Sequence, residues 1–431
     1  MMDLPEAFLS RMAERLGAEY EDFLRSYGEP ACRGLRLNPL KRAEGTSLPA
    51  LGEAVPWERD AWYVPLDTDA GARPLHEVGA YYMQEPSAML PAAVLAPVPG
   101  ERVLDLCAAP GGKTTQLGAR LAGKGLLVAN EPVMKRCQIL SRNVERMGLT
   151  NALVVCAMPE QLAARWPEGF DAIQVDAPCS GEGMFRRHPE TRAEWTADAP
   201  VGCAKRQGEI LDSAAALTRP GGRLVYSTCT LNPVENEGVV DAFCARHPDF
   251  APVPFQLPGA DAPTGLLTCF PHRMRGEGQF VALLRRRGEG EARLDADRSL
   301  PRPDRAALAA LSGFAACAEE NVVLLGGAMT ALPGLPDVKG LRVLRAGVQL
   351  GAMKGRVFQP DHAWAVSAVP PPLPRVPLTE AEARRYQAGE VLPAPGFKGF
   401  VLPTLAGLPL GWGKVSDGMM KNHYPKGLRR G

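Results

Sequence analysis

Between residues 81 and 285 the sequence alternates short apolar runs with longer amphipathic segments, and this alternation constrains the fold most strongly. The apolar runs that predict strands are 103–106, 126–129, 153–155, 172–175, 223–226 and 279–284. The amphipathic segments that predict helices are 113–121, 132–147, 203–217 and 233–245. Strands that alternate with helices form a mostly parallel sheet covered on both faces. We therefore predict an α/β, Rossmann-like, doubly wound sheet that ends in one antiparallel strand.

The segments on either side of this core predict smaller parts. Residues 1–75 combine a helical pattern over 5–27 with an irregular stretch, and are expected to form an N-terminal accessory domain. The core domain is placed at 76–287. A charged stretch with Gly and Pro at 288–303 is expected to be a linker, followed by a small mixed α/β module at 304–370. A Pro-rich spacer then leads to a small β-rich module at 378–431.

Composition restricts the partners of the chain. Lys and Arg number 49 against 48 Asp and Glu, so any basic surface must be local. The ten cysteines form no Cys-x-x-Cys pair, which argues against a zinc ribbon, and no metal is expected. The N-terminus does not resemble a signal peptide, and no apolar run is long enough to span a bilayer. We expect a cytoplasmic protein with reduced thiols, no membrane contact and a monomeric state.

A glycine-rich loop, residues 105–114 (DLCAAPGGKT), joins the first strand to the first helix. A phosphate-binding P-loop would need Gly at position 107, where the chain has Cys107, and the Gly-x-Gly-x-x-Gly spacing of dinucleotide folds is absent. S-adenosylmethionine needs a tight loop of small residues and an acid for its ribose at the end of the second strand. Glu131 stands at that strand end. The alternative for Glu131 is a first-turn acid favoured by the helix dipole.

Two cysteines follow neighbouring predicted strands. Cys179 lies in the string DAPCSG after the fourth strand, and Cys229 in STCT after the fifth. Most cysteines are buried hydrophobic residues, but two at adjacent strand ends beside a methyl donor indicate chemistry. A thiolate that adds to carbon 6 of cytosine makes carbon 5 nucleophilic. Asp176 could donate to, or hydrogen-bond, ring nitrogen 3 if its surroundings raise its pKa. The residues alone do not decide which thiol attacks.

Residues 105–114, 176–183 (DAPCSGEG) and 227–237 (STCTLNPVENE) resemble the RNA cytosine-5 methyltransferases of the Sun/Fmu (Nop-type) family. Residues 410–414 (LGWGK) and 421–429 (KNHYPKGLR) resemble its bacterial members that act on small-subunit rRNA. The resemblance implies a class I S-adenosylmethionine-dependent methyltransferase core and a PUA-like C-terminal module. It implies 5-methylcytosine formation in 16S rRNA, either free or in the 30S subunit. The alternatives are the same chemistry on tRNA, or an inactive RNA-binding assembly factor.

The resemblance also assigns roles. Cys229 would be the nucleophile, Cys179 would help to release the product, and Asp176 would contact both cofactor and base. The other cofactor-binding residues would be Cys107, Ala108, Ala109, Pro110, Gly111, Gly112, Lys113 and Glu131. The RNA-binding residues would be Arg36, Asn38, Lys421, His423, Tyr424, Lys426 and Arg429, with Trp412 among the aromatic rings of the basic tail. For Arg36 and Asn38, which precede the core, the alternative is a place near the active site.

The chain departs from the family at two positions. Many relatives carry an acidic residue near the cofactor adenine, where this chain has Met158, which is expected to pack against the ring instead. Relatives often have two aromatic residues after the Glu-Gly near position 278, where Gln279 replaces one. We expect the change to Gln279 to be tolerated on the last strand.

Overall fold

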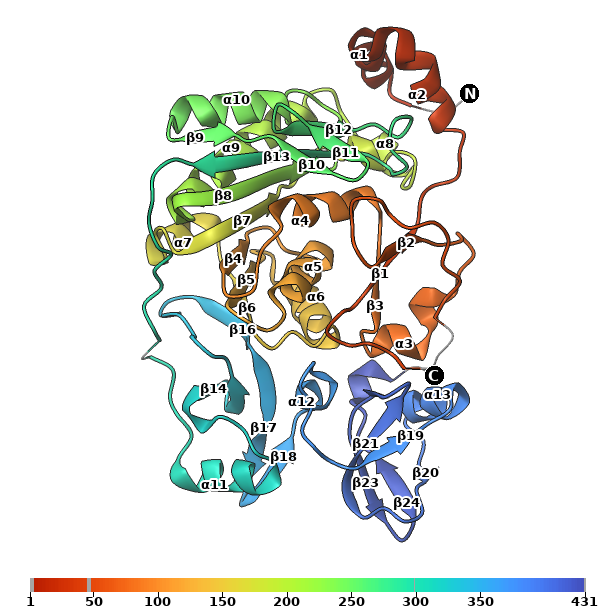
Figure 1. Cartoon of the computed structure of the whole chain (residues 1–431), viewed down its shortest axis with the longest axis vertical. Coiled ribbons are helices and arrows are strands. Elements are labelled where there is room, and N and C mark those ends of the chain that lie inside the picture. The colour runs from red at the N-terminus through yellow and green to blue at the C-terminus, as the bar shows by residue number, and fades with distance from the viewer. Residues whose placement is uncertain (1–3, 45–47, 298, 430–431) are drawn as a thin grey trace.

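A computed structural model describes residues 4–44, 48–297 and 299–429 of the chain. Within these residues a nine-stranded central sheet confirms the predicted doubly wound fold (Figure 1). Its parallel strands are β4 (Arg102–Asp105), β5 (Leu126–Asn130), β6 (Ala152–Cys156), β7 (Phe170–Asp176) and β8 (Thr218–Thr228). They lie in the order β8-β7-β4-β5-β6, so the strand order reverses beside β4. Ligands bind at the carboxyl ends of strands at such a point.

Helices cover both faces of this sheet because neighbouring strand residues are apolar on both sides. Val103 and Leu127 pack on one face with α4 (Leu90–Leu95), α5 (Gly112–Leu121) and α6 (Met134–Arg146). Leu104 and Val128 pack on the other face with α7 (Pro159–Arg165), α9 (Ala199–Leu217) and α10 (Glu237–Arg246). All four strand side chains are fully buried. Burial of each contributes about 1.5–3 kcal/mol.

Antiparallel strands border the sheet on both edges, whereas the sequence predicted only one. On one edge β13 (Gln279–Arg286) pairs with β8, and β12 (Leu266–Cys269) and β9 (Phe250–Pro252) pair with β13. A hairpin of β10 (Phe255–Leu257) and β11 (Ala260–Ala262) lies between β9 and β12 in the chain. On the other edge β16 (Arg342–Ala346) pairs with β6. The segment beyond the predicted linker therefore contributes a strand to the central sheet.

The rest of the segment before residue 370 forms its own small sheet. Its order is β14 (Val322–Leu325), β15 (Ala328–Ala331), β17 (Val348–Lys354) and β18 (Val357–Pro360), with α11 (Arg305–Phe314) and α12 (His362–Val366) beside it. The last part contains β19 (Arg375–Pro377), α13 (Glu380–Ala388), β20 (Leu392–Pro393), β21 (Gly399–Leu405), β22 (Leu408–Pro409), β23 (Gly413–Ser416) and β24 (Met419–Asn422). This final module is mixed rather than purely β, because α13 begins with a Thr379–Glu382 capping box.

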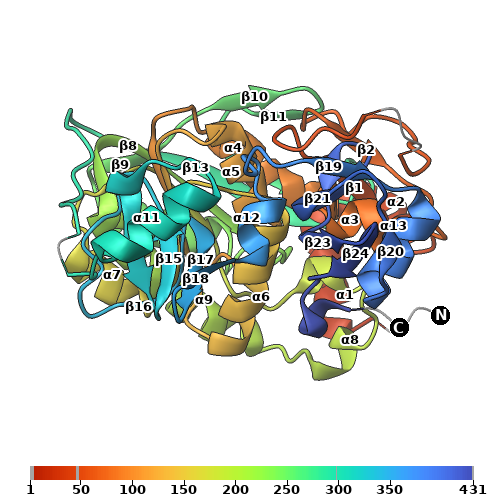
Figure 2. The ribbon, with the colours of Figure 1, turned by 90° about the horizontal axis from the view of Figure 1, so that it is seen from below.

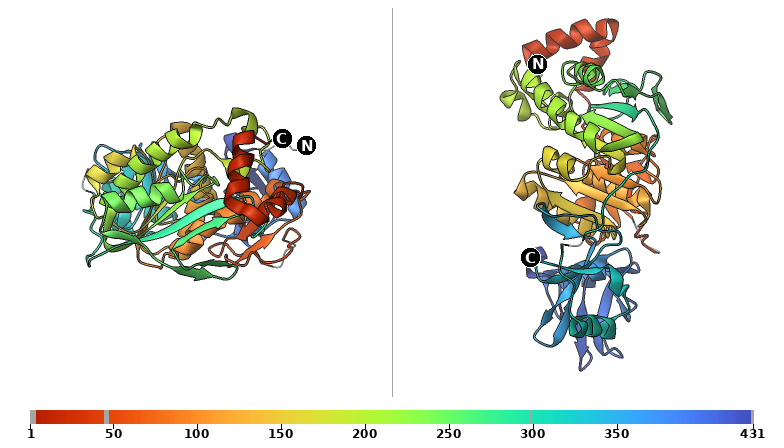
Figure 3. Two further views of the ribbon diagram at one scale, coloured as in Figure 1. Left: turned by 90° about the horizontal axis from the view of Figure 1, so that it is seen from above. Right: turned by 90° about the vertical axis from the view of Figure 1, so that its left-hand side faces the viewer.

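The N-terminal part runs from one end of the molecule to its middle (Figure 1). The predicted helix over 5–27 is divided at Gly17 into α1 (Glu6–Leu16) and α2 (Tyr20–Ser26), which lie at one end (Figure 3, right). A three-stranded sheet, β2 (Ala61–Tyr63), β1 (Gly34–Leu37) and β3 (Tyr81–Gln84), follows with α3 (Pro74–Glu77). Figure 2 shows this sheet beside the C-terminal module. The two share a hydrophobic core in which Leu35 and Tyr81 belong to the same cluster as Tyr386 and Leu405.

Candidate active site

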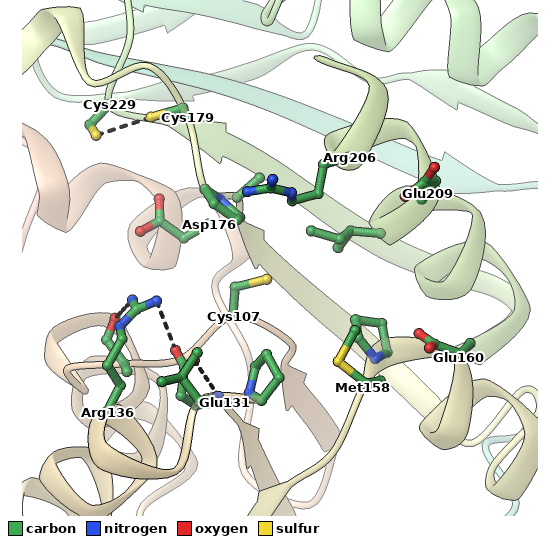
Figure 4. A pocket seen from close by; sticks show the side chains of 17 residues that line it. Cys107, Glu131, Arg136, Met158, Glu160, Asp176, Cys179, Arg206, Glu209 and Cys229 are labelled. Atoms are coloured by element: carbon green, nitrogen blue, oxygen red, sulfur yellow. Dashed lines mark hydrogen bonds and ion pairs between the residues drawn. The ribbon is translucent and has the colours of Figure 1, made fainter. Parts of the chain in front are cut away.

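The carboxyl ends of β4, β5, β7 and β8 surround a cavity of about 470 Å³, a volume typical of small-molecule sites. Figure 4 shows side chains from several loops and helices directed toward it. The predicted site residues that line the cavity are Cys107, Ala109, Glu131, Asp176, Cys179 and Cys229. The structure therefore brings together residues that are up to 122 positions apart in the chain, from 107 to 229.

The glycine-rich loop forms one side of this cavity by running close to α6. A Cβ atom on Gly111 would lie 3.3 Å from atoms of Leu140 and Asn143, and its φ of +113° also favours glycine. Asn143 Nδ2 donates a hydrogen bond to Pro110 O at 2.8 Å. Cys107 lines the cavity, and burial raises the pKa of its thiol, so it is an uncharged wall residue.

The next side of the cavity carries a buried carboxylate directly after β5. Glu131 is 2% exposed, and its Oε1 accepts a hydrogen bond from Val133 N at 3.0 Å. Its Oε2 lies 3.3 Å from Arg136 Nη1. A buried carboxylate retains acceptor capacity that suits a ribose diol. The contact with Val133 N, just before α6, also fits an acid placed at the start of a helix. A ribose-binding role and a helix-start role for Glu131 are therefore compatible.

The wall opposite Glu131 includes residues that the sequence did not single out. Met158 lines the cavity just before α7. From α9, the side chains of Arg206, Glu209 and Ile210 reach the same cavity (Figure 4). Their three- and four-residue spacing places them on one helix face, and this was the only available signal.

Three donors surround the Asp176 carboxylate at the end of β7. Lys113 Nζ lies 2.7 Å from Oδ2, and Ser227 Oγ lies 2.7 Å from Oδ1. Gln279 Nε2 lies 3.2 Å from Oδ1. Burial lowers the pKa of Lys113, but the charge of Asp176 and, less strongly, that of Cys229 leave it above its usual value. Asp176 is therefore an acceptor in this structure, beside a permanent cation.

The two predicted thiols lie next to each other above Asp176 (Figure 4). Cys179 Sγ is 3.1 Å from Cys229 Sγ. The hydrogen bond with Cys229, together with burial, raises the pKa of Cys179 well above its usual value. The loop that carries Cys179 is fixed by Glu235, whose Oε2 accepts hydrogen bonds from Ser180 N at 2.9 Å and Gln207 Nε2 at 3.0 Å.

Arg36 and Asn38, expected to contact RNA, are buried inside the protein. Arg36 is 2% exposed, and its Nη2 donates to Gly112 O at 3.1 Å and Thr115 Oγ1 at 2.9 Å. Asn38 Nδ2 donates to Gly79 O at 2.8 Å and to Met147 O at 2.9 Å. Their polar groups have partners within the fold, so the expected contact with RNA is wrong, whereas the other expectation, a place near the active site, fits Arg36, which contacts Gly112 of the cofactor loop. Arg36 instead supports the start of α5.

The C-terminal residues expected to bind RNA divide into two groups. Lys421, His423, Lys426 and Arg429 are exposed. Tyr424 is 5% exposed, and its ring contacts Tyr386 and His362, with ring centroids 5.5 Å and 5.4 Å apart. Trp412 is also buried, and its Nε1 donates to Asp361 O at 2.7 Å. The prediction that these two rings stack on RNA is wrong because both belong to the packed interior.

Two features are absent from the described residues. Over 4–44, 48–297 and 299–429, no group of three or more His, Cys, Asp or Glu side chains is arranged to hold a metal ion. Over the same ranges, no helix has the length and apolar character that crossing a membrane requires.

Comparison with known proteins gives matches along the whole chain. Four sequence profiles match: the N-terminal domain of 16S rRNA methyltransferase RsmF at 4–86, 16S rRNA methyltransferase RsmB/F at 92–285, the first C-terminal domain of RsmF at 309–367, and the RsmF PUA domain at 374–430. A solved methyltransferase homologue from Pyrococcus horikoshii is 27% identical with a TM-score of 0.57, over 66% of this chain and 96% of that one.

Two curated relatives carry the same name, ribosomal RNA small subunit methyltransferase F. The one from Klebsiella pneumoniae is 34% identical, and the one from Salmonella paratyphi B is 33% identical. Each match covers 99% of this chain and 96% of the relative. This identity over nearly the full length of both proteins, together with the four profiles in their order, shows that the chain belongs to the family of ribosomal RNA small subunit methyltransferase F, RsmF.

Proposed function

We propose that this chain transfers a methyl group from S-adenosylmethionine to carbon 5 of a cytosine in small-subunit rRNA, through a covalent bond between Cys229 and the base. The observation that carries the proposal is the pair of thiols 3.1 Å apart at the ends of β7 and β8, beside the Lys113–Asp176 ion pair. One chain carries all of these groups, so the reaction needs no second copy. We place the enzyme in the cytoplasm, with its rRNA substrate.

The cofactor would occupy the 470 Å³ cavity. Glu131 would accept hydrogen bonds from the ribose, the loop at 107–113 would hold the amino-acid part, and Met158 and Ile210 would cover the adenine. When bound, S-adenosylmethionine supplies an electrophilic methyl group on its sulfonium. The buried acceptor Glu131 and the apolar wall fit a ligand that is polar at one end and aromatic at the other.

Cys229 begins the reaction on the base. Its thiolate forms a bond to carbon 6, and the ring electrons move to carbon 5, which becomes the nucleophile for methyl transfer. After the thiolate adds, nitrogen 3 takes a proton from solvent, and Asp176, held as an acceptor by three donors, would accept the hydrogen bond of that N–H and so stabilise the adduct.

Cys179 completes the reaction. Once carbon 5 carries both the methyl group and a proton, that proton must leave before the bond from Cys229 to carbon 6 can break. Cys179, as a thiolate, would take the proton, the double bond between carbons 5 and 6 would re-form, and Cys229 would leave as a thiolate. The raised pKa of Cys179 makes it a strong base once ionised.

The target cytosine must be unpaired or rotated out of its helix, at a cost of about a few kcal/mol, because a thiol cannot reach carbon 6 of a stacked base. The exposed Lys421 and Lys426 of the PUA-like module would offset part of this cost by binding phosphates of the surrounding rRNA. We propose an N-terminal domain at 1–75, a catalytic domain at 76–287, a linker at 288–303 and two C-terminal modules at 304–370 and 378–431. The strand β16 of the first C-terminal module joins the catalytic sheet.

The experiment that tests this function compares Cys179→Ala, Cys229→Ala and the control Cys317→Ala, a thiol in the α11–β14 region. Each protein is incubated with S-adenosylmethionine and 16S rRNA and then analysed on a denaturing gel. We expect Cys179→Ala to accumulate a protein–RNA adduct, Cys229→Ala to form none, and Cys317→Ala to behave as wild type. The reverse pattern would exchange the roles of the two thiols. Absence of both adduct and methyl transfer by wild type would refute the function.

A further inference from the structure

Gln279 occupies the position on β13 that faces the end of the nucleophile strand. β13 runs antiparallel to β8, with Phe280 opposite Thr228. The next position along this register places Gln279 beside Cys229, where β8 ends. Gln279 is 2% exposed. A polar side chain this deeply buried usually has a defined partner, because an unpaired amide would cost about 1–3 kcal/mol.

The partner of Gln279 is the Asp176 carboxylate. Gln279 Nε2 lies 3.2 Å from Asp176 Oδ1, which also accepts the 2.7 Å hydrogen bond from Ser227 Oγ. A carboxylate only accepts, so the amide nitrogen of Gln279 must be the group that faces it. The other oxygen, Oδ2, binds Lys113.

These contacts fix the carboxylate from three directions. Lys113 belongs to α5, Ser227 to β8 and Gln279 to β13, so three different elements hold the two oxygens. A terminal carboxylate rotates broadly about its last torsion, and a second donor on Oδ1 narrows that rotation. An aromatic residue at 279 would leave Oδ1 with Ser227 alone.

We infer that Gln279 is a positioning residue: its amide orients the Asp176 carboxylate toward the base that Cys229 attacks. The inference rests on the proposed methyl transfer and deepens it. It also changes the interpretation of the sequence, in which the replacement of an aromatic residue by Gln279 was expected only to be tolerated. In this chain the replacement adds a donor to the site.

Two variants test this role in the full-length protein with S-adenosylmethionine and 16S rRNA. Gln279→Met keeps the length but removes the donor, and we expect kcat to fall about tenfold with an unchanged KM for RNA. Gln279→Glu replaces the donor by a second carboxylate next to Asp176. Two neighbouring carboxylates of like charge disfavour each other's ionisation. The acid limb of the kcat–pH profile should therefore move to higher pH by about one unit or more. The matched control is Gln359→Glu, an exposed strand residue in the C-terminal half.

Each outcome separates the inference from its alternatives. An unchanged pH profile for Gln279→Glu, with wild-type kcat for Gln279→Met, would overturn the inference while leaving methyl transfer intact. A purely structural role would lower the melting temperature and the active fraction without moving the profile, and would overturn it equally. If Gln279→Glu does not fold, the kcat-against-KM comparison for Gln279→Met decides. If wild type and Gln359→Glu both fail to methylate rRNA, the proposed function itself fails, and the inference with it.

Discussion

Asp105 is expected to make the stability of the catalytic domain depend on pH. It ends β4 beneath the glycine-rich loop and is 1% exposed. Its Oδ2 accepts a hydrogen bond from Thr114 Oγ1 at 2.6 Å, whereas its Oδ1 has no partner among the described residues. Burial, with a smaller contribution from the charge of Asp176, raises the pKa of Asp105 from 3.8 to about 7. The folded protein therefore favours the protonated acid.

The sign of the effect follows from this raised pKa. Between pH 3.8 and about 7 the folded state binds a proton at Asp105 that the unfolded state has lost. Stability is then complete below pH 3.8 and decreases as pH rises toward 7, by about 1.4 kcal/mol per unit and up to about 4 kcal/mol in total. Asp105→Asn cannot ionise and can keep the bond from Thr114. The variant should gain little at pH 4 and up to about 4 kcal/mol at pH 8.

Urea unfolding of wild type and Asp105→Asn at pH 5, 6, 7 and 8, without cofactor, measures this difference. We expect the advantage of the variant to grow with each step up to pH 7 and then to level off. Asp261→Asn, an exposed change on β11, serves as the control and should show no such trend. A difference between Asp105→Asn and wild type that stays constant from pH 5 to 8 would refute the reasoning, because it would mean that Asp105 does not change its ionisation on folding.

Four further variants test other contacts. Arg36→Met removes two hydrogen bonds to the start of α5 and should lower the free energy of unfolding by about 2–4 kcal/mol; an unchanged urea midpoint would contradict a supporting role. Glu131→Gln should weaken S-adenosylmethionine binding about 10- to 100-fold in calorimetry, since a charged acceptor is lost, and an unchanged Kd would remove Glu131 from the ribose site. Lys421→Ala and Lys426→Ala should each reduce the slope of log affinity against log salt concentration by about 0.7 for rRNA binding. The control Lys124→Ala, an exposed residue just before β5, should not change this slope.

The central sheet was predictable because its signal is local. A strand buried on both faces is apolar at nearly every position, so a run such as 126–129 can be recognised as a strand from the sequence alone. The observed strand β5 extends from Leu126 to Asn130. β16 gives no such signal. Its burial is uneven, and it forms a strand by pairing with β6, about 190 residues earlier in the chain (342 against 152). An edge pairing of this kind depends on a distant partner that composition does not reveal.

The proximity of the proposed catalytic residues was predictable for a related reason. Neighbouring parallel strands end at the same edge, so the register of β7 with β8, in which Asp176 lies opposite Ser227, brings the loops that follow them together. Cys179 and Cys229 lie in those loops. The RNA-binding residues were less predictable, because a polar side chain such as Arg36 can be exposed or fully paired inside the fold. Only the tertiary contacts decide between these two states.

The aromatic residues of the C-terminal module show how the same ambiguity affects the RNA proposal. Among its basic and aromatic side chains, Trp412 and Tyr424 turn inward, whereas His423 is exposed and Phe400 is half-buried. Lys414 Nζ lies 5.2 Å from the Phe400 ring centroid, and the His423 ring lies 5.7 Å from it. Because a base can stack only on a ring that reaches solvent, we expect any stacking by this module to use partly exposed rings such as His423, Phe400 and Phe397 rather than the two buried rings. Loss of RNA affinity in Trp412 variants would therefore report unfolding of the module, whereas loss in His423 variants would report contact.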